Sequence, residues 1–174
     1  MQYLSNSHSN RGMDAQNFVS DVVNIYNSKG WAAIQEIAVP IVHSRKGFAY
    51  GRKSTVDFVG LAYNKHVDFD VKSTRERTRF PLANIGQHQY NWLEMSRNQG
   101  SNSFILINFV KLNEWYVLTF SILKEYWERW KTGGKASIPI ADLRMDAISV
   151  REGGKTGLDF LEFLKGSNKV EKFS

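Results

Sequence analysis

Cysteine is absent from this sequence, and that absence removes three kinds of chemistry. A chain without cysteine forms no disulfide, offers no thiolate to a metal ion and has no cysteine nucleophile. Such a composition suits a reducing compartment, where disulfides are rare. We therefore expect a cytoplasmic protein.

Long apolar runs are also missing. No stretch approaches the roughly 20 apolar residues that a membrane-spanning helix needs. The first twelve residues, Met1–Gly12, are polar and do not have the pattern of a secretory signal peptide. We expect no membrane partner.

The composition that remains predicts a folded domain with a polyanionic partner. Hydrophobic residues make up 42% of the chain and aromatic residues 13%, which is typical of a globule and not of a disordered chain. A length of 174 residues favours one domain. The net charge of +6 favours binding to a polyanion such as nucleic acid. We predict a disordered tail over residues 1–9 and a single domain over residues 10–174.

The most informative stretch is Val67-Asp68-Phe69-Asp70-Val71-Lys72, in which apolar and charged residues alternate. Successive side chains of a β-strand point to opposite faces. Asp68, Asp70 and Lys72 would therefore share one face, and the apolar residues would share the other. The polar face would carry two carboxylates and an ammonium at steps of roughly 7 Å.

A second strand-like run, Thr55–Val59, places a third carboxylate, Asp57, beside this motif. Residues 60–65 can turn the chain back, so a hairpin would bring Asp57 next to Asp70. Hard cations such as Mg²⁺ prefer oxygen ligands, and a nearby lysine can orient a metal-bound water. The spacing favours a metal-dependent nuclease centre in which Asp57 and Asp70 bind the metal and Lys72 is catalytic. The alternative is an edge strand with a solvated polar face.

A longer series of motifs resembles the RecU family of Holliday junction resolvases, which belongs to the PD-(D/E)xK nucleases. In chain order, the segments that carry the resemblance are Asn10–Met13, Ser54–Asp57, Val67–Thr74, Phe80–Leu82 and His88–Gln89. The likeness extends from Asn10 to about Leu164. It implies an α/β fold like that of restriction endonucleases, with a mixed sheet flanked by helices and a short protruding basic hairpin, the stalk, over residues 41–53.

The resemblance also implies an activity and partners. The expected enzyme is a homodimer that uses Mg²⁺, or Mn²⁺ in its place, to cut four-way DNA junctions by paired symmetric nicks in recombination and repair. The backbone carbonyl of Val71 would be a third metal ligand, and Asp68 an outer-shell or second-metal ligand. Gln89 would hydrogen-bond a scissile phosphate or a metal-bound water. Thr55 would orient Asp57 or contact a phosphate.

Basic residues gather at three places where DNA contacts are expected. The family likeness puts Arg11, before the first helix, on a phosphate. Cations interleaved with aromatic rings in the stalk suit phosphates and unpaired bases. A third group follows Lys72 directly. The residues expected to bind DNA are Arg11, Arg45, Lys46, Arg52, Lys53, Arg75, Arg77 and Arg79.

Some features depart from the family or point elsewhere. The family usually has a glutamate in the first helix where this chain has Gln16. Whether this helix supplies a further acidic metal ligand is therefore an open question. His88 is a candidate general base, although a lone histidine is more often structural. The run Gly133–Ser137 lacks the spacing of a P-loop, so we expect no nucleotide cofactor, although Lys131 and Lys135 could touch DNA. The open alternatives are a nuclease for other branched or single-stranded DNA, and a non-catalytic DNA-binding regulator of recombination.

Alternating helical and strand patterns predict a mixed sheet flanked by helices. Asp14, Asn84 and Ser121 are the expected helix caps. The predicted helices are 13–28, 84–97, one that begins at 121, and 158–164, and the predicted strands include 31–42, 103–109 and 114–120.

Overall fold

A six-stranded mixed sheet forms the centre of the computed structural model, which describes residues 8–38, 41–44, 47–50 and 55–167. In spatial order its strands are β1 (Ala32–Glu36), β4 (Phe58–Ala62), β5 (Lys65–Thr74), β7 (Asn102–Phe109), β8 (Glu114–Thr119) and β10 (Ile148–Val150). Only the central pair, β5 and β7, is parallel, and every other pair in this sheet is antiparallel. The predicted mixed sheet is confirmed.

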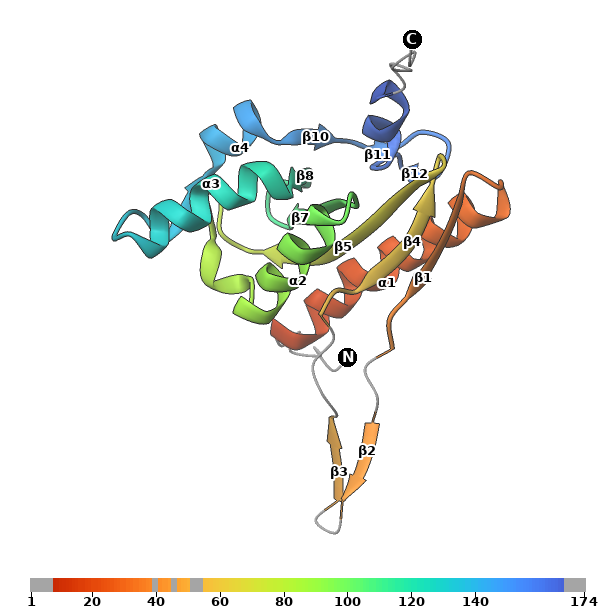
Figure 1. The fold of residues 1–174 in the computed structure, drawn as a ribbon, viewed down its shortest axis with the longest axis horizontal. Coiled ribbons are helices and arrows are strands. Elements are labelled where there is room, and N and C mark those ends of the chain that lie inside the picture. Colours follow the sequence, from red (N-terminus) through yellow and green to blue (C-terminus); the bar gives the residue numbers. More distant parts are fainter. Residues whose placement is uncertain (1–7, 39–40, 45–46, 51–54, 168–174) are drawn as a thin grey trace, which may run out of the picture.

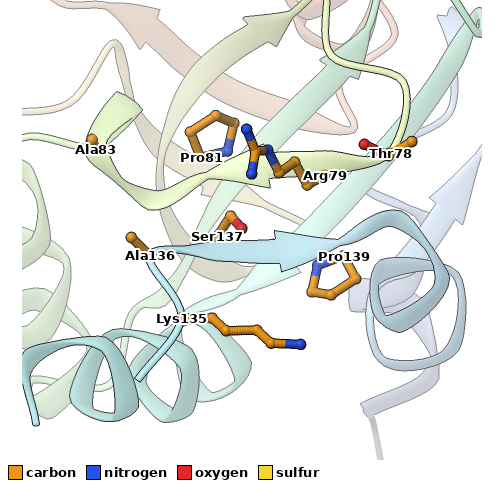
Figure 2. A pocket seen from close by; sticks show the side chains of 8 residues that line it. All are labelled: Thr78, Arg79, Pro81, Ala83, Lys135, Ala136, Ser137 and Pro139. Carbon is orange, nitrogen blue, oxygen red and sulfur yellow. The ribbon is translucent and has the colours of Figure 1, made fainter. Parts of the chain in front are cut away.

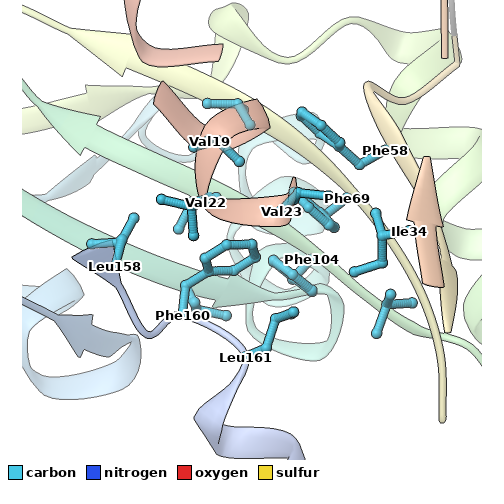
Figure 3. Close-up of a cluster of buried hydrophobic side chains, with 14 of the residues drawn as sticks. Val19, Val22, Val23, Ile34, Phe58, Phe69, Phe104, Leu158, Phe160 and Leu161 are labelled. Atoms are coloured by element: carbon cyan, nitrogen blue, oxygen red, sulfur yellow. The ribbon is translucent and has the colours of Figure 1, made fainter. Parts of the chain in front are cut away.

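Helices cover both faces of the sheet (Figure 1). Helix α1 (His8–Ser28) packs on one face, and helices α2 (Gln87–Asn98) and α3 (Phe120–Lys131) pack on the other. On the α1 face, the ring of Phe69 stacks between Phe58 and Phe104, at centroid distances of 4.9 and 4.7 Å (Figure 3). Burial of these large rings anchors β4, β5 and β7 to α1.

The alternation predicted for β5 is present. Val67, Phe69 and Val71 belong to the core under α1. Asp68 and Asp70 therefore point to the α2 face, where both are buried. Strand β7 is buried along Ser103–Phe109, as its continuous apolar sequence predicts for a strand covered on both faces.

The hairpin between β4 and β5 turns more tightly than expected. Its two turn residues are Tyr63 and Asn64, with φ of 49° and 64°. Two left-handed residues in a row give the turn that matches the twist of two antiparallel strands. Gly60, which was expected in the turn, lies in β4. A Cβ there would come within 2.2 Å of the Ala33 carbonyl oxygen, because β1 approaches closely.

Three expectations for the first 42 residues differ from the structure. Helix α1 already includes His8 and Ser9, which were expected in a disordered tail, and Asp14 lies inside the helix instead of capping it. The strand expected over residues 31–42 ends at Glu36. Proline cannot donate to a strand ladder, so Pro40 is a poor residue for extending it.

The expected stalk is present as a separate two-stranded hairpin. Its strands are β2 (Ile41–Ser44) and β3 (Gly47–Tyr50), which pair antiparallel with each other. Figure 1 shows this hairpin standing away from the central sheet. It leaves the sheet after Ile37, whose N–H donates to the carbonyl oxygen of Asp57 at 2.7 Å.

Three other element ends differ from the prediction. A short 3-10 turn, η1 (Leu82–Asn84), occupies the expected start of α2, so the helix begins at Gln87 and its N-cap is Gly86 instead of Asn84. Helix α3 starts directly after β8, so Ser121 is inside it and Thr119 is the N-cap. The expected helix over residues 158–164 is divided between β12 (Gly157–Leu158), which pairs with β11 (Glu152–Gly153), and the 3-10 helix η2 (Glu162–Ser167).

A small two-stranded ribbon lies beside the main sheet. Its strands are β6 (Arg79–Pro81) and β9 (Ser137–Pro139), and helix α4 (Ile140–Asp146) follows β9. Phe80 and Ile138 are fully buried in the core under α2 and α3, which holds the ribbon in place. Among the described residues, no helix is both long and apolar enough to cross a membrane.

Candidate active site

The hairpin brings Asp57 to Asp70. Phe58 faces Phe69 in the β4–β5 ladder, so Asp57, which comes just before β4, falls opposite Asp70. The backbone N–H of Val71 donates to Asp57 Oδ2 at 2.8 Å. This bond fixes the Asp57 carboxylate against β5, and the juxtaposition expected from the sequence is present.

Asp70 is fully buried, and side chains from α2 and from β5 contact it. Its Oδ1 accepts a 2.8 Å hydrogen bond from Gln89 Nε2, and its Oδ2 lies 2.6 Å from Lys72 Nζ. Asp70 Oδ2 accepts no hydrogen bond within the described residues, so its contact with Lys72 is an ion pair only. Gln89 is oriented in turn because its Oε1 accepts from the N–H of Gly86 at 3.0 Å. The amino-terminal turn of α2 therefore positions Asp70.

The Asp57 carboxyl is costly to ionise in the folded protein. Burial, and next the charge of Asp70, raise the pKa of Asp57 to about 7, while the Val71 N–H and Lys72 act in the opposite direction. Burial and a neighbouring negative charge both disfavour the ionised form of Asp57. A divalent cation beside it would favour that ionised form instead.

The donor set fits a hard, partly hydrated cation. Asp57 and Asp70 offer carboxylate oxygens, and Mg²⁺ typically binds one or two carboxylates together with water and phosphate oxygens. In the described ranges, no group of three or more His, Cys, Asp or Glu side chains gathers as a metal cage. The arrangement therefore fits a Mg²⁺-type site better than a closed zinc site.

Asp57, Val71 and Lys72 line a hollow of about 490 Å³, called here the Asp57 hollow. Lys72 is one-fifth exposed to it, while Asp70 lies beneath the surface. The hollow can admit a phosphate group with its water. Its lining residues are Gln16, Asp57, Val71, Lys72, Ser73, Thr74, Arg75, Glu76, Pro81 and Asn84.

Gln16 lines this hollow and is held by an acidic residue that sequence reasoning missed. Its Nε2 donates to Glu36 Oε1 at 2.7 Å, and the hydroxyl of Ser20 donates to the other oxygen of Glu36. A carboxylate only accepts hydrogen bonds, so the Gln16 amide turns its nitrogen to Glu36. No pattern singles out Glu36, because the contact joins β1 to α1.

Asp68 has a different environment from its neighbour Asp70. It is only 3% exposed, and its Oδ1 accepts hydrogen bonds from the hydroxyls of Ser96, Ser101 and Ser103 at 2.9, 2.5 and 2.7 Å. These hydroxyls come from α2, from the residue before β7 and from β7 itself. Asp68 therefore ties α2 to the sheet, and it is not among the residues that line the Asp57 hollow.

Of the other predicted site residues within the described ranges, Arg75 is the one that lines the hollow. Arg77 and Arg79 follow it as exposed residues. Thr55 is half-buried two residues before Asp57, and His88 is exposed in the first turn of α2; neither lines the hollow. Arg11 belongs to α1. The predicted DNA contacts that fall outside the described residues are Arg45, Lys46, Arg52 and Lys53.

Comparison with known proteins points to one family. The sequence matches the family described as recombination protein U (RecU) over residues 10–166. A Holliday junction resolvase RecU from Lactobacillus delbrueckii subsp. bulgaricus is 30% identical over 167 residues, which cover 90% of this chain and 80% of that protein. Another, from Geobacillus kaustophilus, is 30% identical over 165 residues, covering 88% and 82%.

Among solved structures, the Holliday junction resolvase Hjc from Archaeoglobus fulgidus is similar with a TM-score of 0.49 and 14% sequence identity. The likeness covers 76% of this chain and 93% of that one.

Proposed function

The chain belongs to the RecU family, and on that premise we propose that it is a Mg²⁺-dependent endodeoxyribonuclease that resolves four-way DNA junctions by paired symmetric nicks. Its relatives are named Holliday junction resolvases. The observation that carries the proposal is that Asp57 and Lys72 line one hollow, while Asp70 contacts Lys72 directly beneath it.

The metal would be held by the carboxylates of Asp57 and Asp70, with the backbone carbonyl of Val71 as a third ligand. When bound, Mg²⁺, or Mn²⁺ in its place, would acidify a water molecule and neutralise charge on the phosphate. The raised pKa of Asp57 supports this assignment, because a bound cation would offset the burial and the negative charge that disfavour the ionised carboxylate. Asp68 would act behind these ligands as an outer-shell group, because three serine hydroxyls hold its Oδ1.

Lys72 would orient the attacking water and stabilise negative charge that develops on the phosphate. Asp70 holds the Nζ of Lys72 in place, and the lysine side chain is partly exposed. The ammonium charge would therefore stand at a fixed position beside the hollow, only partly screened by solvent. Gln89 would act through Asp70. It is a positioning residue, because its amide nitrogen is used in holding that carboxylate.

DNA would approach over the basic residues that surround the hollow. Arg75, Arg77 and Arg79 would contact phosphates along one edge, while Arg11, Thr55 and the stalk residues would contact the strands near the branch. A four-way junction has two-fold symmetry, which a homodimer matches by presenting two equivalent hollows. Paired nicks in opposite strands follow from that symmetry.

The test uses an end-labelled four-way junction, a matched linear duplex and a fork, each with and without Mg²⁺. The expected result is paired symmetric nicks on the junction only, lost in the Asp57→Ala, Asp70→Ala and Lys72→Ala variants while DNA binding persists. Asp21→Ala is the control, because Asp21 is an exposed acid on α1. Equal cutting of forks would instead indicate a general branched-DNA nuclease. Tight binding without any cutting in Mg²⁺ or Mn²⁺ would indicate a non-catalytic regulator.

A further inference from the structure

The outer face of the ribbon formed by β6 and β9 carries an arginine and a serine beside two prolines. Arg79 pairs with Pro139, and Pro81 pairs with Ser137, so these four side chains share one face of the ribbon. Phe80 and Ile138 point the other way, into the core. Figure 2 shows Arg79 extending toward Pro81, and Lys135 extending along β9 toward Pro139.

The backbone that carries this face is held in place at both ends. Both ends of the ribbon are closed by backbone hydrogen bonds, from Leu82 N–H to the Ala136 carbonyl at 3.0 Å and from Ile140 N–H to the Thr78 carbonyl at 2.8 Å. A ligand would meet side chains that already stand on a fixed backbone, which lowers the entropy cost of binding.

The face surrounds a second hollow, of about 670 Å³, called here the ribbon hollow. Pro81 lines both the ribbon hollow and the Asp57 hollow, so the two adjoin at that residue. Arg79 and Lys135, which precedes β9, lie about four residue steps apart along this face, or roughly 13 Å. A span of that length can meet more than one phosphate of a DNA strand.

The cations at this hollow are not neutralised by the protein. Arg79 and Lys135 are exposed, and within the described residues neither forms an ion pair with a carboxylate. Arg75 and Arg77, on the segment that leads into the ribbon, are equally without such partners there. Arg75, Arg77, Arg79 and Lys135 therefore offer positive charge that no carboxylate of the described residues neutralises, on the segment and ribbon next to the Asp57 hollow.

We propose that the ribbon hollow is a phosphate-binding site, in which Arg79 and Lys135 contact the DNA backbone a few nucleotides away from the phosphate at the Asp57 hollow. The Ser137 hydroxyl, on the same face, would donate a hydrogen bond to a phosphate oxygen. This inference rests on the proposed function, because it gives the backbone of the cut strand a second anchor. A second anchor would set the register of the strand over Lys72.

The first test measures how binding of a fluorescent four-way junction depends on salt, by anisotropy in EDTA so that no strand is cut. Each lost phosphate contact should reduce the slope of log K against log salt by about 0.9. We expect that reduction in Lys135→Ala and in Arg79→Ala, and about twice as much in the double variant. Lys155→Ala is the matched control, because Lys155 is exposed and lies near Trp31 at the opposite end of β5.

The second test finds which phosphate is involved. Junctions with one neutral methylphosphonate at successive positions near the nick should bind wild-type protein more weakly at one or two of those positions. The same substitution should have no further effect on the double variant, because its contact is already lost. Circular dichroism and thermal melting would establish that each variant is folded.

The outcomes separate this inference from the proposed function. An unchanged salt slope in the folded double variant, or an equal change in Lys155→Ala, would overturn the ribbon site even if junctions are still nicked. A reduced slope limited to the ribbon variants would support the site even if Asp70→Ala and wild type prove equally inactive. In that second case only the nuclease proposal would fail.

Discussion

The side-chain amide of Gln89, in the first turn of α2, donates a 2.8 Å hydrogen bond to the fully buried carboxylate of Asp70 on β5. This bond fixes the orientation of that carboxylate. The other end of the same amide accepts from the N–H of Gly86. Both polar ends of Gln89 are therefore used within the protein. Its position depends on the packing of α2 on the sheet.

Replacing Gln89 should weaken catalysis through Asp70. We expect Gln89→Ala to lower the nicking rate by roughly 10- to 100-fold and to raise the Mg²⁺ concentration needed, as is typical when a partner that orients a metal ligand is lost. Nicking rates measured across a Mg²⁺ titration would test this. Gln87→Ala is the control, because exposed Gln87 bonds only to Asn91 among the described side chains. A wild-type Mg²⁺ titration for Gln89→Ala would show that Asp70 does not need this bond.

The Asp57 carboxyl should make the metal-free protein less stable as pH rises. The pKa of Asp57 is about 7 in the folded protein against an ordinary value of 3.8, so the folded state holds the proton more tightly. Stability contributed by this group is present below pH 4 and is lost as pH rises toward 7. In the Asp57→Asn variant this pH dependence should be absent, because asparagine has no carboxyl group to titrate.

Melting temperatures in EDTA should therefore separate the wild type from Asp57→Asn. The two curves should run together near pH 4 and diverge up to pH 7, with the variant higher by about 2–4 °C for each kcal/mol. Adding Mg²⁺ at pH 8 should raise the melting temperature of the wild type more than that of the variant. Parallel curves across the whole range would contradict the raised pKa.

Asp68 should contribute more to stability than to metal binding. Asp68→Ala would leave the Ser96, Ser101 and Ser103 hydroxyls without their shared acceptor, and we expect a loss of about 2–4 kcal/mol in the free energy of unfolding. Urea denaturation would measure it, with Ser103→Ala as a smaller change in the same cluster. If Asp68→Ala kept its stability but needed much more Mg²⁺, Asp68 would be a metal ligand.

Gly60 should tolerate no side chain. A Cβ at Gly60 would lie 2.2 Å from the Ala33 carbonyl oxygen, so Gly60→Ala must push β1 away from β4. We expect a loss of about 1–3 kcal/mol in the free energy of unfolding, as for other overpacked sites. Gly166→Ala is the control, because nothing lies within 4 Å of its added Cβ. Equal unfolding curves for the two variants would show that β1 yields without cost.

Sequence alone predicted the pieces of the site that follow from local periodicity. The alternation over Val67–Lys72 placed Asp70 and Lys72 on one face of β5, because the side-chain period of a strand is two. A hairpin then required Asp57 to meet Asp70. Element ends were less predictable. Asn84 looked like a helix cap, but the segment Leu82–Asn84 is fixed by its packing against the core and by the β6–β9 ribbon.

What the sequence by itself determined is the pairing of strands β4 and β5 and the chemistry of the residues they carry. Only the tertiary structure decided which groups support that chemistry. The alternating pattern puts Asp68 on the same strand face as Asp70, yet Asp68 meets hydroxyls from residues 28, 33 and 35 positions away, and Gln89 reaches Asp70 across 19 positions. Such contacts depend on how α2 and β7 pack against β5, and packing leaves no periodic signal in the chain.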